Sequence, residues 1–370
     1  MASANRDIVH VVERCRGGVA TYVTELMRRQ RDSGDWRQVS LVADPRFVEP
    51  ALGQAADAIQ TYDSSRKPLG VASAARAVQA HIDRARPALV HLHSSFPGVY
   101  GRLFAPKGSN APAIVYCPHG WAFEMQGAAA KQTVYAWMER SLAPKADVIV
   151  SISEHERLAA ERRGLKHPAH VTISHGVRDA FVGPPLDLGP GLNLLFVGRF
   201  DRQKGLDLLL KAMALSQRQD VRLHLIGGAD QGDTFVLPDD PRIVAHGWVA
   251  HDELDRWYKA ADAVVMPSRW EGFGLVAIEA MRNGTPVLAS ARGALPDVVG
   301  DAGLIFDPEV ASCVAALIDG LDSDTLAPLG SVAQARFLSD FTAERAAAEL
   351  DAAYALAAER RLRRPGNRAQ

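Results

Sequence analysis

Short apolar runs alternate along this chain with longer segments in which apolar residues recur every three or four positions. Short runs bounded by turn residues predict buried strands, and the longer spacing predicts amphipathic helices. In the first half, the predicted strands lie at residues 7–12, 38–43, 88–91, 113–116, 148–151 and 170–173. Because strands and helices alternate, we expect a parallel sheet covered by helices.

The same pattern restarts after residues 181–190, FVGPPLDLGP, whose proline and glycine content is typical of a linker. The predicted strands of the second half lie at residues 192–197, 221–226, 242–245, 263–266, 287–289 and 304–306. We therefore predict two doubly wound α/β domains, at residues 1–183 and 190–340, followed by a helical C-terminal segment at 341–370. Ligands of open parallel sheets bind beyond the carboxyl ends of the strands, so two facing domains would share one cleft.

Composition narrows the class of protein. A chain of 370 residues is too long for one ordinary core. Its 42 basic and 43 acidic residues leave a net charge of −1, which argues against a nucleic-acid partner. The three cysteines lie far apart and predict reduced thiols in the cytoplasm. The first residues lack a signal-peptide pattern, and no run approaches the roughly 20 apolar residues that span a bilayer.

The stretch from Arg269 to Ala291, RWEGFGLVAIEAMRNGTPVLASA, predicts a loop, a helix, a turn and a strand. Gly272 and Gly274 favour an irregular backbone before a helix N-terminus, whose N–H groups and partial positive charge suit a phosphate. Carboxylates beside an anion site are suited to holding hydroxyl groups, and Glu271 and Glu279 are the candidates. The alternative is a charged first turn and a surface carboxylate. Apolar surroundings weigh against it, because an unpaired carboxylate there is costly.

A second loop, residues 198–205, joins a predicted strand to a predicted helix and carries three cations. Arg199 offers a forked donor and Lys204 a compact point charge, so together they suit a diphosphate. The alternative is a solvated charged loop. Its position at a strand end favours phosphate binding.

In the first half, Gly17 and Gly18 form a turn between a strand and a helix, where backbone N–H groups could approach a phosphate. The turn lacks the full dinucleotide fingerprint. His119 follows a strand between a rigid proline and a permissive glycine, which favours a fixed side chain at the end of the sheet. A single histidine is more often structural, and His91 and His93 compete for the same role. The spacing of the histidines predicts no metal site.

Three segments together resemble the retaining nucleotide-sugar glycosyltransferases of family 4, which have the GT-B fold. They are VGRFDRQKGLDLLLKA, EGFGLVAIEAMRNGTPVLAS and GALPDVVGDAGLIFDP. The first half is similar more weakly, through HLHSSFPGVYGRL, CPHGWAF and ISHGV, to members that build surface or exopolysaccharide glycans. The chain departs from the family pattern at His175, where asparagine is usual, and at Ala294, where glycine is common.

The resemblance implies a role for each matching residue. The diphosphate would lie on Arg199 and Lys204, the ribose on Glu279 and the transferred sugar on Glu271, with His119 near the anomeric carbon. The implied catalytic residues are His119, Glu271, Arg199 and Lys204. The implied donor-binding residues are Gly17, Gly18, Arg199, Lys204, Trp248, Val249, Glu271, Gly272, Phe273, Gly274, Leu275 and Glu279. The resemblance implies neither a metal nor a cofactor, and a final helix that crosses back to the first domain.

The implied reaction moves a sugar from a nucleotide-diphosphate sugar, such as a UDP-sugar, to a saccharide or lipid-linked acceptor, with retention at the anomeric carbon. We expect a cytoplasmic enzyme with room for peripheral contact at the inner face of the membrane through Arg28, Arg29 and Arg31. Helix capping is the simpler reading of these arginines. Two other functions stay open. One is a nucleotide-sugar epimerase on the same fold, and the other is a non-catalytic nucleotide-sugar-binding protein.

Overall fold

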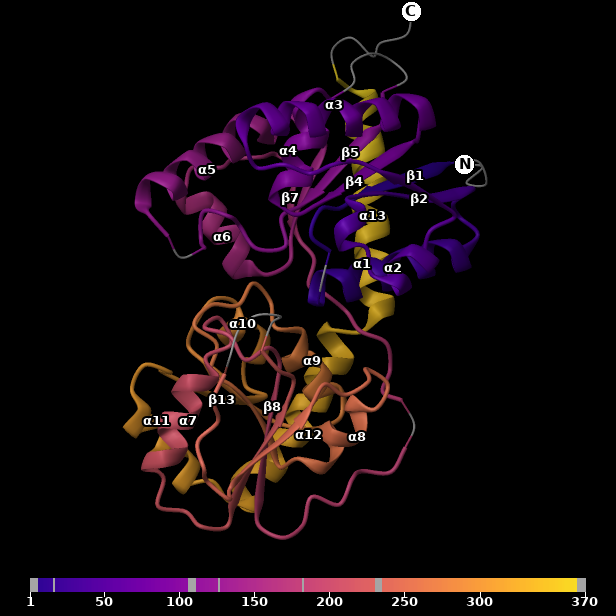
Figure 1. Cartoon of the computed structure of the whole chain (residues 1–370). Coiled ribbons are helices and arrows are strands. Elements are labelled where there is room, and N and C mark those ends of the chain that lie inside the picture. The colour runs from indigo at the N-terminus through magenta and orange to yellow at the C-terminus, as the bar shows by residue number, and fades with distance from the viewer. Residues whose placement is uncertain are drawn as a thin grey trace, which may run out of the picture. The chain divides into compact units, whose positions relative to one another are not determined.

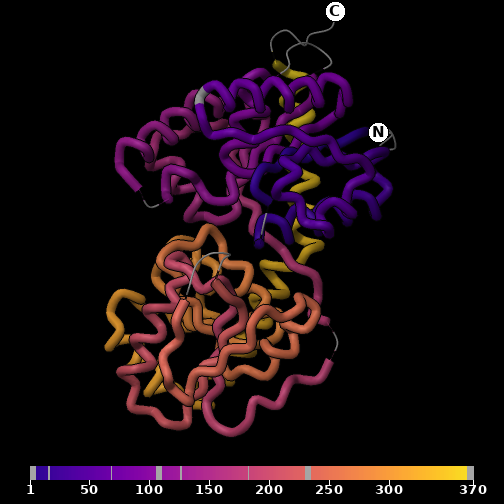
Figure 2. Tube along the Cα trace, in the orientation of Figure 1, coloured from indigo at the N-terminus to yellow at the C-terminus, as the bar shows by residue number. Residues whose placement is uncertain are grey.

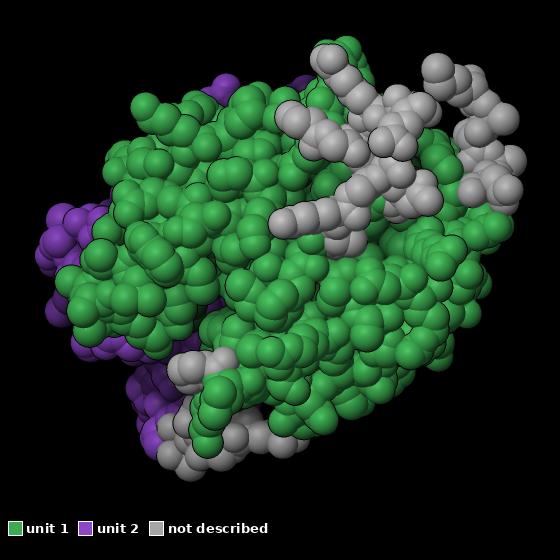
Figure 3. Space-filling view, turned by 90° about the horizontal axis from the view of Figure 1, so that it is seen from above, with its two compact units in different colours: residues 1–173, 347–370 green, residues 174–346 purple. Residues whose placement is uncertain are grey.

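A computed structural model describes residues 6–15, 17–105, 111–125, 127–181, 183–229 and 235–364. The chain divides into two compact units, coloured separately in Figure 3. Unit 1 comprises Met1–Ile173 and Ala347–Gln370, and unit 2 comprises Ser174–Ala346. The first five residues of the chain and the end of its basic tail lie outside the described residues.

Unit 1 is built on a seven-stranded parallel sheet with the strand order β3-β2-β1-β4-β5-β6-β7. Its strands are β1 (Asp7–Val11), β2 (Gln38–Ala43), β3 (Ala58–Thr61), β4 (Leu89–His93), β5 (Ala113–Cys117), β6 (Val148–Ser151) and β7 (His170–Thr172). The central strands β1, β4 and β5 are buried along their whole length, as continuous apolar runs of parallel sheets are.

Helices cover both faces of this sheet. They are α1 (Gly18–Ser33), α2 (Pro50–Gln54), α3 (Pro68–Ala85), α4 (Ser95–Leu103), α5 (Ala129–Leu142) and α6 (Glu154–Arg162), with short 3₁₀ turns η1 (Pro45–Phe47) and η2 (Ala143–Lys145). In Figure 1, α1 and α2 lie on one side of the sheet and α3 and α4 on the other. The order of the strands reverses between β1 and β4, so this is where a ligand site is expected.

Unit 2 repeats the design with a six-stranded parallel sheet in the order β10-β9-β8-β11-β12-β13. The strands are β8 (Leu192–Val197), β9 (Val221–Ile226), β10 (Ile243–Gly247), β11 (Ala263–Met266), β12 (Val287–Ser290) and β13 (Gly303–Phe306). The helices are α7 (Leu206–Leu215), α8 (Leu254–Ala260), α9 (Leu275–Arg282), α10 (Leu295–Val299), α11 (Ala311–Asp319) and α12 (Ser323–Asp340). The predicted pair of doubly wound α/β units is confirmed.

The last helix, α13 (Ala343–Leu362), belongs to both units, and its course is easily followed in the yellow end of the trace in Figure 2. The alanine-rich sequence from Phe337 to Arg364 predicts one continuous helix, but the structure breaks the helix after Asp340. Phe341 is buried at the break, and its carbonyl accepts a hydrogen bond from the amide of Val177 at 3.0 Å. This contact ends α12 and starts a new helix. No helix in the described part of the chain is long and apolar enough to cross a membrane.

The division between the units falls at Ile173, before the expected linker at residues 181–190. Val182, inside that linker, lies outside the described residues. The start of the linker is held by unit 2. The amide of Phe181 donates to Asp255 at 2.7 Å, and Lys259 donates to the carbonyl of Phe181 at 3.1 Å. The proline and glycine content of residues 181–190 correctly predicted an irregular segment. The contacts of Phe181 with Asp255 and Lys259 show that the start of this segment belongs to unit 2.

Candidate functional site

Two loops of unit 2, residues 198–205 and 267–274, are tied together at the carboxyl ends of β8 and β11. Arg269 forms two hydrogen bonds of 2.7 Å with the carboxylate of Asp207, in the first turn of α7. The amide of Arg269 also donates to the carbonyl of Gln203 at 2.9 Å. A bidentate arginine pair fixes orientation as well as distance. The two loops that the sequence singled out are therefore held as one surface.

Lys204 and Glu271 meet on this surface. The Lys204 ammonium lies 2.7 Å from Glu271 Oε2, and the two side chains are only 19% and 12% exposed. The Ser268 hydroxyl donates to the same oxygen at 3.5 Å. Arg199, more exposed, pairs with Asp201 at 2.9 Å and reaches Gln203 at 3.2 Å. Three of the four predicted catalytic residues, Arg199, Lys204 and Glu271, therefore lie in unit 2, and both cations are paired with carboxylates.

Two glycines allow the loops to approach each other. A Cβ on Gly205, which has φ of 69°, would lie 2.1 Å from the carbonyl oxygen of Pro267. A Cβ on Gly293, with φ of 61°, would lie 2.1 Å from the carbonyl oxygen of Glu271. Only glycine fits where the backbone is left-handed and another strand of backbone is this close. Ala294, which departs from the family pattern, is buried, and its amide donates to the Glu271 carbonyl at 3.0 Å.

The N-terminus of α9 begins at this surface. Gly274 is its N-cap residue, with φ of 103°, and α9 has neither a side-chain cap nor an acidic residue in its first turn. No side chain of the cap or first turn therefore accepts from the first N–H groups of α9, and the positive end of the helix dipole lies beside this surface. Phe273, predicted to bind the donor, turns its ring into the core of unit 2 against His175 and Phe341, so its amide is the group left to act.

Glu279 lies on α9, buried at 5% exposure, and the hydroxyl of Tyr258 on α8 donates to its Oε2 at 2.8 Å. Burial raises the pKa of Glu279, and the nearby His251 and the Tyr258 hydrogen bond oppose that shift. The sequence analysis did not identify Tyr258 as the partner, because it lies on a different helix. Trp248, after β10, is 67% exposed and presents a free aromatic surface, and Val249 beside it is partly buried.

In unit 1, the predicted residues lie at the carboxyl ends of the strands. Gly17 is the N-cap residue of α1, with φ of 59°, and both Gly17 and Gly18 are exposed. His119 follows β5 with φ of 51°, a left-handed conformation that is uncommon for a residue with a side chain. Burial of the imidazole lowers the pKa of His119 to about 3. The ring is therefore neutral at physiological pH.

His119 is the outer end of a chain of hydrogen bonds. Its Nε2 lies 3.0 Å from His93 Nδ1, and His93 Nε2 lies 3.0 Å from His10 Nδ1. His10 Nε2 lies 2.7 Å from the side-chain oxygen of Gln30, whose amide nitrogen donates to the hydroxyl of Tyr354 on α13 at 3.2 Å. Burial lowers the pKa of His10 to about 4.

The direction of this chain follows from Gln30. Its oxygen can only accept, so His10 Nε2 carries the proton and His10 Nδ1 accepts from His93. His93 Nε2 therefore carries the proton of that ring, so His93 Nδ1 accepts a hydrogen bond from His119 Nε2. The arrangement therefore places the proton of His119 on Nε2 and a lone pair on Nδ1.

The sequence analysis did not anticipate the clustering of His10, His91 and His93. Each of the three offers a ring nitrogen, and these atoms lie within 4.8 Å of one another. His91 and His93 share one face of β4, and the register of β1 with β4 pairs His10 with His91. Spacing along the chain could not reveal a cluster built by strand pairing. The expectation of no metal site stays a prediction.

A buried glutamate holds the loop that carries His119. Glu156 on α6 accepts hydrogen bonds from the amides of Gly120 at 2.5 Å and Ile152 at 2.7 Å. Burial raises the pKa of Glu156 from its ordinary 4.5 to about 7, and the two backbone hydrogen bonds oppose that shift. Ser153 caps the helix through the Glu156 amide, as the capping pattern predicts. The carboxylate serves the neighbouring loop as well.

Unit 1 contains a pocket of about 240 Å³ at the carboxyl ends of β1, β4 and β5. His119 lines it, together with Glu13 and Arg14 after β1, Ser94 at the start of α4, and Arg66. The sequence analysis placed an acceptor site near His119 without naming the others. Arg28 and Arg31, considered for membrane contact, pair with Glu25 at 3.2 Å and Asp57 at 2.7 Å.

Comparisons with known proteins match both halves of the chain. Residues 191–323 match the family model described as "Glycosyl transferases group 1", and residues 17–176 match that of the "Glycosyl transferase 4-like domain". An uncharacterized 41.2 kDa protein in the cps region of Klebsiella pneumoniae is 30% identical over 327 residues, 85% of this chain and 89% of that protein.

Solved structures share the fold. Sucrose-phosphate synthase from Thermosynechococcus elongatus is similar with a TM-score of 0.76 and 24% identity, covering 95% of this chain and 98% of that one. HepE of Anabaena in complex with UDP-glucose has a TM-score of 0.76 and 19% identity, covering 94% and 100%. These likenesses establish the GT-B fold expected from the sequence.

Proposed function

Because the chain belongs to the glycosyl transferases group 1 family, we propose that this glycosyltransferase moves a sugar from a UDP-sugar to a saccharide or lipid-linked acceptor. The cps-region location of its relative in Klebsiella pneumoniae supports a role in surface polysaccharide biosynthesis. The UDP-glucose complex of HepE supports the choice of UDP.

The observation that carries the proposal is the Lys204–Glu271 pair at the N-terminus of α9. Breaking the bond between the anomeric carbon and the phosphate oxygen leaves a positive sugar and a negative diphosphate. Lys204, Arg199 and the uncapped N–H groups of α9 would stabilise the diphosphate as its charge develops. Glu271 would hold Lys204 in place and accept hydrogen bonds from the sugar hydroxyls.

The remaining predicted residues take roles that their surroundings support. Glu279, oriented by Tyr258, would accept hydrogen bonds from the ribose, and Trp248 would border the base. In unit 1, Gly17 and Gly18 would offer backbone N–H groups to the phosphates. His119 would lie near the anomeric carbon, where its neutral ring adds no charge of its own.

We further propose that the acceptor attacks on the face from which the diphosphate leaves, so that the anomeric configuration is retained. The departing phosphate oxygen would take the proton of the acceptor hydroxyl. A double displacement in the manner of retaining glycosidases needs two carboxyls about 5 Å apart. The Lys204 ammonium donates a hydrogen bond to the Glu271 carboxylate, which makes Glu271 a poor nucleophile for such a double displacement.

Replacing Lys204 with methionine tests the leaving-group role. We expect UDP release from UDP-glucose to fall by roughly 10²–10³ in kcat, the usual loss for one transition-state donor. Lys211→Met, on the exposed side of α7, is the matched control and should keep wild-type turnover. Near wild-type turnover in Lys204→Met would refute the role proposed for Lys204 in stabilising the leaving group.

The same assay separates the other functions. The product's anomeric proton, followed by NMR, should keep the configuration of the donor, and an inverted product would refute retention. An epimerised sugar formed without acceptor would identify an epimerase. Binding of UDP-glucose without turnover on any acceptor would identify a non-catalytic binding protein.

A further inference from the structure

The pocket of unit 1 is lined by three cations that rest on aromatic rings. The Arg14 guanidinium lies 5.1 Å from the centre of the Phe47 ring, and the Arg66 guanidinium lies 4.8 Å from that of Phe96. The Lys131 ammonium lies 5.7 Å from the ring of Tyr135. An aromatic face orients a cation without neutralising its charge. Among the described residues, no carboxylate forms an ion pair with Arg14 or Lys131.

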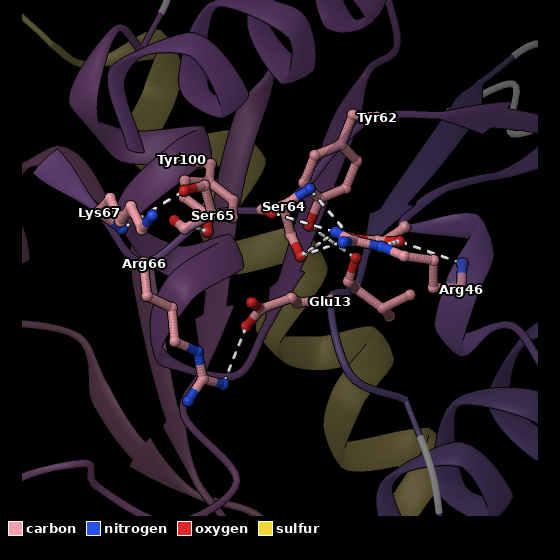
Figure 4. A network of polar contacts seen from close by, with 10 residues as sticks. Glu13, Arg46, Tyr62, Ser64, Ser65, Arg66, Lys67 and Tyr100 are labelled. Carbon is pink, nitrogen blue, oxygen red and sulfur yellow. Dashed lines mark hydrogen bonds and ion pairs between the residues drawn. The ribbon is translucent and has the colours of Figure 1, made fainter. Parts of the chain in front are cut away.

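A neighbouring arginine, Arg46, shows the contrasting case, in which the charge of the guanidinium is fully paired with a carboxylate. Arg46 donates hydrogen bonds to both oxygens of the Asp44 carboxylate. It also reaches Ser64, and both residues are labelled in Figure 4. Arg66, on the other side of the same view, has a single hydrogen bond of 3.4 Å to Glu13. The fork of Arg66 is therefore engaged at one nitrogen only among the residues described here.

The charges of the pocket do not balance. Three cations face one carboxylate, Glu13, whose side chain is only 6% exposed. His119, also in the lining, is neutral because burial lowers its pKa to about 3. A concave surface with excess positive charge concentrates its field where a ligand would lie.

Backbone strain is concentrated at the same pocket. Ser94 has φ of 73° and His119 has φ of 51°, and both line the pocket. Arg86 is the only other non-glycine residue with positive φ in the described part of the chain. Strain of this kind costs about 1–3 kcal/mol per residue and collects at ligand-binding positions.

We propose that this pocket binds a negatively charged group of the acceptor, a carboxylate or a phosphate on its sugar. The inference rests on the proposed function, because it names the class of acceptor that the transferase uses. Arg66 offers a planar fork that matches either oxyanion, and Lys131 and Arg14 add charge around it. The carboxylate of Glu13, beside Arg66, accepts a hydrogen bond from a hydroxyl of the same sugar. The volume of about 240 Å³ suits one sugar unit rather than a longer chain.

Matched glycosides test the charge preference. Binding of p-nitrophenyl β-glucuronide, p-nitrophenyl β-glucoside and p-nitrophenyl β-glucoside 6-phosphate to the full chain is measured by calorimetry, with UDP present. The glucuronide and glucoside differ only at C6, so a carboxylate preference shows directly, and the phosphate arm shows which oxyanion is bound better. We expect at least one anionic ligand to bind roughly tenfold more tightly than the glucoside, with the advantage falling as salt rises.

Substitutions place the preference in the pocket. Arg66→Ala should lower the affinity for the anionic ligand roughly tenfold, and Lys131→Ala less, because an ammonium lacks the planar fork that bonds both oxygens of an oxyanion. Arg76→Ala is the control, since Arg76 lies 5.7 Å over the ring of Phe104 but outside the pocket lining. Thermal unfolding of each variant checks that the chain is folded.

The outcomes separate this proposal from the proposed function. Equal binding of the glucoside and both anionic ligands overturns it, and so does a preference that survives the Arg66→Ala and Lys131→Ala double substitution. UDP release from UDP-glucose is measured in parallel. Release without an anion preference supports the transferase and overturns this inference. An anion preference without release from any nucleotide sugar supports an anion site in the pocket, but it overturns the transferase and with it the assignment of the anion to an acceptor.

Discussion

The predicted catalytic residue of unit 1, His119, is an uncharged imidazole at the end of a hydrogen-bonded chain of histidines, whereas Lys204 and Glu271 of unit 2 form an ion pair. Burial explains the first case, because it lowers the pKa of His119 and His10 far below neutrality. The Lys204–Glu271 pair is only partly buried, with side chains 19% and 12% exposed. The same doubly wound architecture thus carries a hydrogen-bonded histidine network around His119 in unit 1 and an ion pair, Lys204–Glu271, in unit 2.

This difference indicates that the two groups of residues have different roles in the proposed reaction. A fixed network of neutral groups can orient a substrate without responding to salt or to pH near neutrality. Fixed charges are suited to a diphosphate whose charge grows as the bond breaks, because no reorganisation is needed at that moment. Their interaction weakens as salt screens it. The following experiments test how far this contrast holds.

The largest effect should come from Glu156, a buried carboxyl group of unit 1 whose pKa is raised to about 7. Its folded pKa lies above its unfolded value, so its contribution to stability is present below pH 4.5 and is lost as pH rises through about 7. At ~1.4 kcal/mol per unit, the free energy of unfolding should fall by about 3 kcal/mol over this window relative to Glu156→Gln.

Local hydrogen exchange measures this loss. The amides of Gly120 and Ile152, which donate to Glu156, should exchange faster at pH 8 than at pH 5 after correction for intrinsic rates, and less so in the variant. Glu279→Gln, in unit 2, is the control and should leave these two amides unchanged. An identical pH dependence in wild type and Glu156→Gln would show that Glu156 does not titrate in this range.

An intermediate effect is expected at Glu279, the buried carboxylate of unit 2. Replacing it with glutamine removes a charged acceptor, so affinity for UDP should fall roughly tenfold. UDP lacking both ribose hydroxyls should bind wild type and Glu279→Gln equally, if the ribose is what Glu279 holds. Calorimetry measures both ligands, and the exposed Glu253→Gln serves as control. A variant that still distinguishes the two ligands would place the ribose elsewhere.

The smallest effect should follow from Gln30, the group that directs the histidine network. Gln30→Leu removes the acceptor of His10 Nε2, so His119 loses its single tautomer. We expect nitrogen NMR to show one tautomer of His119 in wild type and a mixture in the variant, with turnover reduced about threefold. Gln79→Leu, on α3, should change neither. One unchanged tautomer in Gln30→Leu would show that the network does not set it.

Sequence alone determined the fold and the loops of unit 2, for a physical reason. Apolar periodicity is local, so it predicted most strands within one or two residues, and the donor-side motifs are contiguous stretches of a strand, a loop and a helix. The short helix α4 was missed because its proline and two glycines resemble a loop, and most of α12 was missed because its apolar periodicity is weak. Helix α11 was missed although its apolar spacing is regular.

Tertiary structure decided what contacts those residues make. The register of β1 with β4 brings His10 beside His91, and α13 adds Tyr354 from the other end of the chain. Neither placement is encoded in local spacing, because both depend on which strands pair and which helix returns. The cation-lined pocket has the same origin, since its three cations come from the segment after β1, the segment after β3 and helix α5. Chemistry carried by one segment could be predicted from sequence, whereas chemistry assembled from several segments appeared only in the folded chain.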